Sequence, residues 1–505
     1  MASGQSYSIV EYFTEHEGYR CGYCKSTNTN FSHGECIWAH MLTVQDYQSL
    51  IDRGWRRSGC YCYKPTMNQT CCPQYTIKCE ALDFRISKSQ KKILKRMTKF
   101  LRNELTNDSA SLTGDDQQDN IDINNEEALN YPKHKMKAQK DKSQINISSV
   151  DDEVSERLSI NPEKTESQKN STSSSSQVQP TNSDSKNTLH IRNEIADAVP
   201  CKKAKLLRIE RKKNKLLAQG KSQSEIESIM KEKKQQNCVK NIEELFEEIY
   251  TGLKKLEIKL MRVMSDEFMS TFEVSASLYK KYQMTIHGDT PDECDQKSFF
   301  DFLVRSPLQQ WIPDTGPSHG YGSFHEQYWL DNELIAVGVI DILPSCISSV
   351  YFFYDPAYSQ LSLGTFSSLR EIYLTRQLNK VASNLRYYYM GFYIHSCPKM
   401  RYKAKMRPSK LLCPETYVWC DIEPSLAKLN NDKYSRLNDD IDAIDEDGVV
   451  NIDEVLILHK NIAMPYKKYR SQRTTREEKR EVEEYASLVG MPCAREMLLL
   501  RYSRE

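Results

Sequence analysis

The chain has 505 residues, which is enough for two or three domains that each bury a core. Its formal net charge is +1, so the average charge indicates neither a polyanion-binding protein nor an acidic one. No run approaches the ~20 apolar residues of a membrane span, and the first residues lack the basic start and apolar run of a secretory signal. We therefore expect an intracellular protein without membrane contact, in a reducing compartment where its 16 cysteines bind metals more readily than they form disulfides.

Residues 1–105 are rich in cysteine and aromatic residues and predict a small metal-binding domain. Cys21 and Cys24 have the C-x-x-C spacing that lets two thiolates turn toward one metal ion. Cys71 and Cys72 are adjacent, and a trans peptide holds neighbouring Cα atoms about 3.8 Å apart, too close for an ordinary disulfide. The two pairs make a set of four thiols that suits tetrahedral zinc or an iron–sulfur cluster. A redox-active C-x-x-C, or buried cysteines without a ligand, are the alternatives.

The same region ends in SKSQKKILKRMTKF, residues 87–100, which predicts an amphipathic helix. Apolar side chains fall on one side of this helix and basic side chains on the other. The basic side could bind the phosphates of a nucleic acid, and the alternative is an exposed helix face without a ligand. The residues proposed for phosphate binding are Lys91, Lys92 and Lys95.

Residues 106–235 predict a long disordered linker followed by a basic helix. Ser, Asn, Asp, Gln and Lys dominate the linker, and its few large apolar residues cannot offset the entropy lost on ordering. The basic stretch CKKAKLLRIERKKNKLLAQGKSQ, residues 201–223, predicts a solvated helix or tail, with nucleic-acid contact as the alternative.

Residues 236–505 predict a second, larger domain with an α/β (α+β) pattern. GYGSFHEQYWL, LIAVGVIDIL and SSVYFFYD read as three strands, LSLGTFSSLREIYLTRQL as a helix, and LRYYYMGFYI as a further strand. This order resembles the mixed sheet of acetyltransferase-like (GNAT/Fem-type) enzymes, in which two strands splay apart beside the helix and leave a slot for an acyl donor and an amine. Gly364 stands nearly alone where a glycine-rich phosphate-binding loop would be expected, so this stretch offers little to bind the pyrophosphate of acetyl-CoA.

A cationic segment with interleaved aromatic residues follows the last of these strands, HSCPKMRYKAKMRPSKLLCPETYVW. Cations and aromatic faces beside a catalytic slot favour a nucleic-acid carrier or an anionic substrate, and a solvated charged surface is the alternative. The candidate binding residues in this segment are His395, Lys399, Arg401, Lys403 and Arg407.

Several long motifs of the chain resemble the eukaryotic arginyl-tRNA-protein transferases of the N-degron pathway. The most specific are CGYCKS, YKPTMNQTCCPQYTIKC, GYGSFHEQYWLDNELIAVGVIDILPSC and LSLGTFSSLREI. The resemblance implies transfer of arginine from arginyl-tRNA to the α-amino group of proteins that begin with Asp, Glu or oxidised Cys, which marks them for ubiquitin-dependent degradation. It also implies metal binding by Cys21, Cys24, Cys71 and Cys72. We further expect a monomer in the cytoplasm and nucleus.

The implied chemistry needs little more than positioning, because the arginyl ester is already activated. Asp341 or His325 is the predicted acceptor or relay of the amine proton, since an acid in an apolar strand needs a reason to be there. Arg407 is the predicted clamp for the acidic side chain, because a guanidinium binds a carboxylate through two hydrogen bonds. The alternative to a transferase is a non-catalytic RNA-binding or metal-sensing protein with the same fold.

Overall fold

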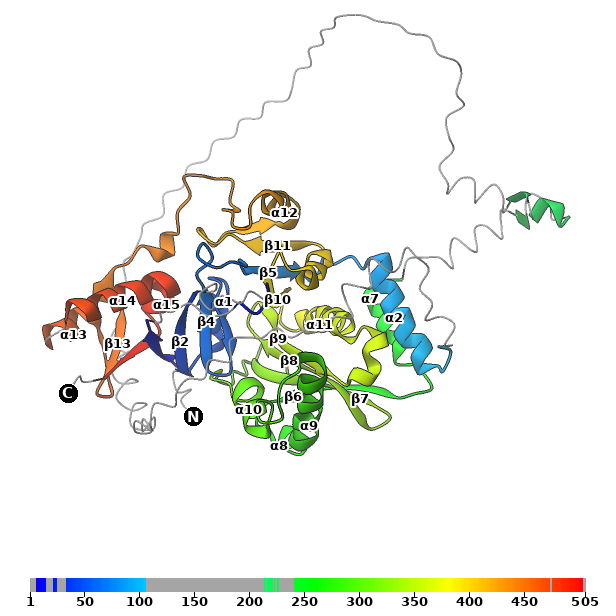
Figure 1. Ribbon diagram of the computed structural model, residues 1–505, viewed down its shortest axis with the longest axis horizontal. Helices are drawn as coiled ribbons and strands as arrows, with labels where there is room; N and C mark the ends of the chain where they lie inside the picture. The colour runs from blue at the N-terminus through cyan, green and yellow to red at the C-terminus, as the bar shows by residue number, and fades with distance from the viewer. Residues whose placement is uncertain are drawn as a thin grey trace, which may run out of the picture. The chain divides into compact units, whose positions relative to one another are not determined.

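The computed structural model describes residues 6–14, 21–24, 33–105, 240–472 and 475–502, and positions 213–214, 216–220, 222 and 225–226. Contacts divide the chain into two compact units, Met1–Ser159 with Asn241–Glu505, and Ile160–Lys240. The first unit contains both β-sheets (Figure 1). The predicted linker and basic helix, 106–235, lie outside the described residues except for the positions just given. Among the described residues, no helix is both long enough and apolar enough to cross a membrane.

The first sheet joins segments from the two ends of the chain. Its seven strands, in order across the sheet, are β14 (Ile462–Pro465), β13 (Leu456–His459), β15 (Leu498–Arg501), β1 (Ile9–Phe13), β2 (Gly34–Met41), β4 (Tyr61–Pro65) and β3 (Arg56–Ser58). β1 pairs in parallel with β15, which places Ile9 beside Leu498. Edge strand β3 lies on the side of this sheet that supplies residues to the pocket described below.

The second sheet contains the strands that the sequence predicts. Its eight strands, in order, are β12 (Trp419–Asp421), β11 (Ser409–Leu412), β5 (Tyr75–Glu80), β10 (Tyr387–Tyr393), β9 (Cys346–Tyr354), β8 (Glu333–Ile342), β7 (Gly322–Leu330) and β6 (Leu256–Arg262). β7 and β8 form a hairpin whose two turn residues, Asp331 and Asn332, both have positive φ. Such a turn matches the twist of the flanking strands and favours Asp and Asn. The predicted mixed α/β class is confirmed.

The predicted N-terminal domain, 1–105, and the predicted catalytic domain, 236–505, contribute strands to both sheets. β5 comes from the first of these segments, yet it pairs with β10 on one side and β11 on the other, both from the second segment. One hydrophobic core likewise includes buried residues of both, such as Leu94 and Leu369. Sequence patterns do not reveal this arrangement, because apolar alternation predicts a strand but not its partner when the partner lies far along the chain.

β9 and β10 lie in parallel but separate after a short paired stretch. Their pairing runs from Tyr387 with Cys346 to Tyr389 with Ser348, and beyond it β9 continues along β8 alone. β10 also has an irregularity between Tyr389 and Phe392, where Gly391 has a φ of 69°. The strand pair therefore splays as predicted.

The helices cover both sheets. Among the described residues, the α-helices of four or more residues are α1 (Val44–Ile51), α2 (Lys88–Leu101), α7 (Ile242–Ile249), α8 (Asp266–Met269), α9 (Phe272–Tyr282), α10 (Gln296–Phe299), α11 (Leu363–Asn379), α12 (Ile422–Asn431), α13 (Tyr466–Tyr469), α14 (Arg476–Val489) and α15 (Met491–Ala494). α11 contacts β9 and β10, and α2, α7 and α11 contact one another (Figure 1). α2 begins with a capping box formed by Ser87 and Gln90, and its buried face includes Leu94, as the predicted amphipathic pattern requires.

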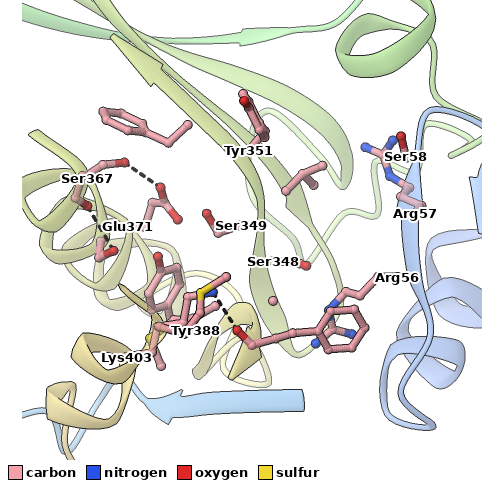
Figure 2. Close-up of a pocket in the computed structure, with 18 of the residues that line it drawn as sticks. Arg56, Arg57, Ser58, Ser348, Ser349, Tyr351, Ser367, Glu371, Tyr388 and Lys403 are labelled. Atoms are coloured by element: carbon pink, nitrogen blue, oxygen red, sulfur yellow. Dashed lines mark hydrogen bonds between the residues drawn. The ribbon is translucent and has the colours of Figure 1, made fainter. Parts of the chain in front are cut away.

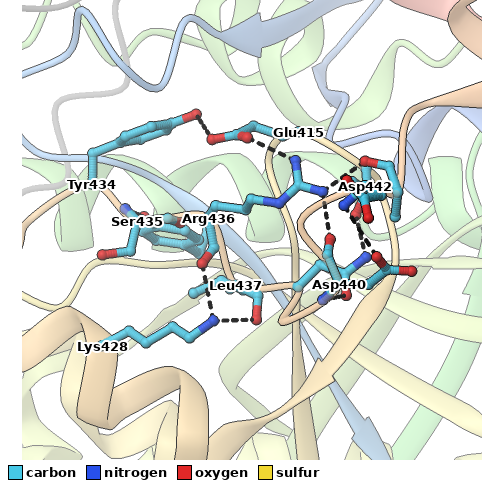
Figure 3. Close-up of polar contacts among 12 residues, drawn as sticks. Glu415, Lys428, Tyr434, Ser435, Arg436, Leu437, Asp440 and Asp442 are labelled. Carbon is cyan, nitrogen blue, oxygen red and sulfur yellow. Dashed lines mark hydrogen bonds and ion pairs between the residues drawn. The ribbon is translucent and has the colours of Figure 1, made fainter.

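An acidic connection leads from α12 to β13 and is held largely by one arginine (Figure 3). Nη1 of Arg436 donates to Glu415 Oε2 at 3.0 Å, and Nη2 donates to the backbone oxygens of Asp440 and Ala443 at 2.7 and 2.6 Å. These contacts order a connection that has little regular secondary structure of its own.

Candidate active site

A pocket of about 150 Å³ opens where β9 and β10 diverge (Figure 2). One water needs roughly 15 Å³, so this space can accept a polar side chain as well as solvent. β3, β9, β10, α11 and the 3₁₀ segment η5 (Pro398–Lys405) all contribute to its lining. The polar and charged residues of the lining include Arg56, Arg57, Ser348, Ser349, Ser367, Ser368, Glu371, Tyr388, Lys399 and Lys403.

Glu371 of α11 forms one side of the pocket. Its carboxylate accepts a hydrogen bond of 2.8 Å from Ser367 Oγ on Oε1, while Oε2 has no hydrogen-bond partner of good geometry in the part of the chain that the structure describes. The backbone of β8 passes close by at Gly338, where a Cβ atom would lie only 3.6 Å from Glu371 Oε1. Burial raises the pKa of Glu371 to about 7; the Ser367 hydrogen bond opposes this rise and the nearby Glu326 carboxylate adds to it.

Arg56 of β3 forms the other side. Its side chain is 5 % exposed, and its Nη1 donates to the backbone oxygens of Trp55 and Ile51 at 2.6 and 3.4 Å. Nε and Nη2 are buried, and no described residue is a hydrogen-bond partner of either nitrogen. These two nitrogens form one edge of the guanidinium, the edge that binds a carboxylate through two parallel hydrogen bonds. The Arg56 guanidinium also lies 5.4 Å from the centre of the Phe392 ring.

Asp341, a predicted catalytic residue, lies inside the protein and not among the pocket residues. Both of its carboxylate oxygens accept hydrogen bonds from Arg57, at 2.7 and 2.5 Å, and Ser323 donates a third at 2.7 Å. A carboxylate that is fully buried and engaged in this way is a structural partner of Arg57. The structure therefore does not support its predicted role as a proton acceptor in contact with the substrate.

His325, the other predicted catalytic residue, is also fully buried. Its Nε2 lies 3.0 Å from the backbone oxygen of Leu303, and its ring packs edge-on against Phe268 and Phe299. Burial lowers the pKa of His325 to about 4, so the ring is neutral at physiological pH. These contacts give His325 a packing role in the core, and its role as a proton relay stays a prediction.

The predicted cationic residues divide between the pocket and the surface. Lys399 and Lys403 line the pocket, and Lys403 Nζ donates to the backbone oxygen of Phe392 at 2.8 Å. Arg401 is exposed and donates to the backbone oxygen of His395. His395 itself is half-buried and interacts with Tyr393 and Asn430.

Arg407, the predicted carboxylate clamp, lies at the surface and outside the pocket lining. Its Nη1 forms an ion pair of 2.7 Å with Glu423, in which the two side chains are 52 % and 59 % exposed. Water competes with any carboxylate at such a position. Among the described residues of the pocket lining, Arg56 has the buried, unpartnered edge that a clamp needs.

Lys91, Lys92 and Lys95 lie on α2 away from its buried side; Lys92 and Lys95 are exposed and Lys91 is half-buried. The helix lies against the segment that precedes α11, where Arg96 donates from Nη1 to the backbone oxygen of Gln360. The structure thus places a basic helix face beside the N-terminal end of α11, the end that carries pocket residue Gly364.

Cys21, Cys24, Cys71 and Cys72 come together, with all four sulfur atoms within 4.8 Å of one another. Two sulfurs bound tetrahedrally to one ion at ~2.3 Å would lie about 3.8 Å apart, close to the 3.6 Å between Cys24 and Cys71. The backbone N–H of Tyr23 points at Cys21 Sγ from 3.4 Å, as in metal knuckles. The donor set and its spacing therefore fit a metal ion, which would replace the thiol protons when it binds.

The cysteine cluster is in contact with the segment that lines the pocket. Cys21 and Cys72 share a small hydrophobic cluster with Ile394 and Met400, and Met400 of η5 also lines the pocket. A bound metal would therefore fix a wall of the pocket through packing.

Comparison with known proteins agrees with this geometry. The family model described as the N terminus of arginine-tRNA-protein transferase matches residues 19–92, and the model of its C terminus matches residues 274–413. A Drosophila melanogaster protein named arginyl-tRNA--protein transferase 1 is 44% identical over 98% of this chain and 100% of its own length. The chain belongs to the arginine-tRNA-protein transferase family.

More distant relatives of this family member match shorter parts of it. The Arabidopsis thaliana arginyl-tRNA--protein transferase 2 is 35% identical over 83% of this chain and 76% of its own length. A Pseudomonas putida protein named aspartate/glutamate leucyltransferase is 38% identical over 28% of this chain and 53% of its own length.

Sequence reasoning missed the two residues that face each other across the pocket. Glu371 had a signal, because Gly364, Ser367, Ser368 and Glu371 recur at helical spacing and form a polar stripe beside the apolar face of α11. Arg56 had no signal in the sequence, because it is adjacent to Arg57 and has the same side chain. The structure separates the two, since Arg57 pairs with Asp341 whereas Arg56 has an edge without a partner among the described residues.

Proposed function

We propose that this chain transfers arginine from arginyl-tRNA to the α-amino group of proteins that begin with Asp or Glu. The names of its relatives support both parts of this reaction, since some specify arginyl-tRNA and others specify aspartate or glutamate. Oxidised Cys, which is also anionic, would use the same acceptor site. Such a modification would mark the acceptor protein for ubiquitin-dependent degradation.

The observation that carries the proposal is that Arg56, a residue of the pocket lining, has a guanidinium edge without a partner among the described residues. A buried guanidinium edge without acceptors is costly, and a bound carboxylate would supply two acceptors at once. Lys399 and Lys403 add positive charge to the same lining. An acidic first side chain is therefore favoured over its neutral amide, which offers one acceptor and no charge.

The transfer itself is an aminolysis of an ester. The neutral α-amine attacks the arginyl carbonyl carbon, a C–N bond forms, and the bond to the ribose oxygen breaks. The proton lost by the amine balances the one gained by the ribose hydroxyl, so no further reactant is needed. An α-amine has a pKa of ~8, so deprotonation requires little help, and the pocket contributes mainly by positioning.

The tRNA would lie along α2, with its 3′ end entering the pocket past the start of α11. The support for this placement is the basic face of α2 and its attachment beside α11 through Arg96. Phosphate contacts of this kind position a nucleic acid without reading its sequence. The four cysteines would hold zinc or an iron–sulfur cluster; their close spacing favours a single ion, because a cluster places further atoms between the thiolates.

The test is a comparison of peptides that begin with Asp and Asn, using arginyl-tRNA labelled in the amino acid. The wild-type chain should prefer Asp strongly, and RNase should abolish transfer. Arg56→Met should lower kcat/KM for the Asp peptide by about a hundredfold and leave the slow Asn reaction nearly unchanged. Arg407→Met is the matched control and should keep the preference for Asp. Equal rates with Asp and Asn peptides in the wild-type chain would refute charge selection.

A further inference from the structure

The charges around Glu371 do not balance. Glu326 of β7 and Glu371 of α11 are both buried, at 0 % and 1 % exposed. Arg370 lies within ion-pair distance of Glu326, 3.0 Å from Nε to Oε1, and neutralises that carboxylate. Tyr328 donates a hydrogen bond of 2.9 Å to the other oxygen of Glu326. Among the described residues, no cation forms an ion pair with Glu371, although a buried carboxylate is stable only when a cation neutralises it.

Glu371 is also distinctive among the groups that line the pocket. Of the described residues in the lining, it is the only one with a carboxyl group, and the charged ones on the other walls are basic. No described residue gives its Oε2 a hydrogen bond of good geometry, although the nearby hydroxyls of Ser349 and Tyr388 oppose the rise of its pKa, and Ser367 and Ser368 also line this wall. This wall thus offers one carboxylate and several oxygen acceptors to a ligand.

Figure 2 shows Glu371 and Arg56 on opposite sides of the two serines that β9 contributes, Ser348 and Ser349. The pocket therefore has an anionic wall and a cationic wall. In the proposed reaction, the acceptor brings an acidic side chain and the donor brings the guanidinium of arginine. The charge of each substrate is opposite to that of one wall. A planar guanidinium fits a carboxylate with flanking hydroxyls better than an ammonium does.

We propose that Glu371 binds the guanidinium group of the arginine carried by the tRNA and thereby selects the amino acid that is transferred. This inference rests on the proposed function, because it assigns the donor side of the same pocket. The substrate guanidinium would neutralise the Glu371 carboxylate, as Arg370 neutralises that of Glu326. Burial raises the pKa of Glu371, so its carboxyl group is readily protonated in the empty pocket and is held ionised by the bound cation.

The test compares two donors that differ only in the charge of the side chain. The same tRNA is charged with arginine or with citrulline, in which a neutral urea of nearly the same shape replaces the guanidinium. Single-turnover rates are measured with the full-length chain and an Asp peptide. The wild-type chain should favour arginine by about a hundredfold or more, because an unpaired buried charge is strongly disfavoured.

Glu371→Gln should reduce transfer of arginine by about a hundredfold and leave transfer of citrulline the same or faster, so that the preference disappears. Glu371→Asp keeps the charge and should retain a preference for arginine at a lower rate. Glu267→Gln, on the exposed surface of α8, is the matched control and should change neither donor. Near-ultraviolet circular dichroism confirms that each variant is folded.

An equal loss with both donors in Glu371→Gln would overturn the inference, because a residue that only moves a proton or supports the fold does not distinguish them. An undiminished preference for arginine in that variant would overturn it as well. Neither result would affect the proposed function, which fails only if the wild-type chain transfers no arginine to the Asp peptide.

Discussion

The Arg57 guanidinium holds both oxygens of the Asp341 carboxylate, with distances of 2.7 Å from Nε to Oδ2 and 2.5 Å from Nη2 to Oδ1. Arg57 lies on β3 of the first sheet and Asp341 on β8 of the second, and the two side chains are 1 % and 0 % exposed. The pair thus joins the two sheets at the wall of the pocket. It also explains why adjacent arginines differ: Arg57 is fully engaged, whereas Arg56 keeps an open edge.

The first prediction concerns this pair. Asp341→Asn should lower the free energy of unfolding by about 3–5 kcal/mol, because it leaves the Arg57 charge buried without its partner. Asp301→Asn is the control, since its ion pair with Arg305 is 42 % and 48 % exposed and should contribute less than about 1 kcal/mol. Urea denaturation measures both. An Asp341→Asn chain of normal stability without arginine transfer would instead restore the catalytic role that the sequence suggests.

The second prediction concerns His325 and pH. Its folded pKa of about 4 lies below the ordinary 6.5, so between these values the unfolded chain binds a proton that the folded chain does not. Stability is therefore fully present above pH 6.5 and is lost as pH falls toward 4, by about 3 kcal/mol. His325→Phe should remove this part of the pH dependence, whereas His319→Gln, at an exposed position, should not. Identical pH profiles for wild type and His325→Phe would contradict the assignment.

Local patterns in the sequence predict strands β7 to β10 of the second sheet and the helix α11, but not what each side chain does there. The hairpin of β7 and β8, the face of α11 and the splayed strands depend on neighbours in sequence, so alternation and helical spacing are sufficient. Asp341 is an acid in an apolar strand, and such an acid needs a reason to be there. The reason is Arg57, which lies 284 positions away, and no local pattern reveals such a partner.

Residues of the candidate site are likewise predictable from the sequence only where the signal is local. The four cysteines can be recognised because metal ligands have a characteristic spacing within each pair. The sequence favours Arg407 over Arg56 because cations near aromatic residues suggest a binding segment, yet exposure decides whether such a cation can clamp a carboxylate. The burial of Arg56 depends on how the two sheets pack against each other, and the sequence alone does not show this packing.

The third prediction concerns the basic face of α2. Changing Lys91, Lys92 and Lys95 together to Ala should weaken tRNA binding and reduce the slope of log K against log salt by about 1 for each phosphate that the helix no longer binds. The control is the triple Ala variant of Lys460, Lys467 and Lys468, which are exposed near β13 and β14 in the first sheet. Filter binding over a range of salt concentrations gives both slopes. Equal slopes for the two triple variants would remove α2 from the tRNA-binding surface.

The fourth prediction concerns the cysteine cluster and its contact with η5. Cys24→Ser should lower metal affinity by more than about a hundredfold, because the loss of one of four ligands is more severe than the loss of a supporting hydrogen bond. The variant should also have a lower Tm and faster proteolysis near Met400, since a bound metal would fix the wall to which this residue belongs. Cys60→Ser, whose thiol lies outside the cluster, is the matched control. Elemental analysis and the absorption of a cobalt-substituted protein report the site directly, and full metal binding by Cys24→Ser would show that the four sulfurs do not act together.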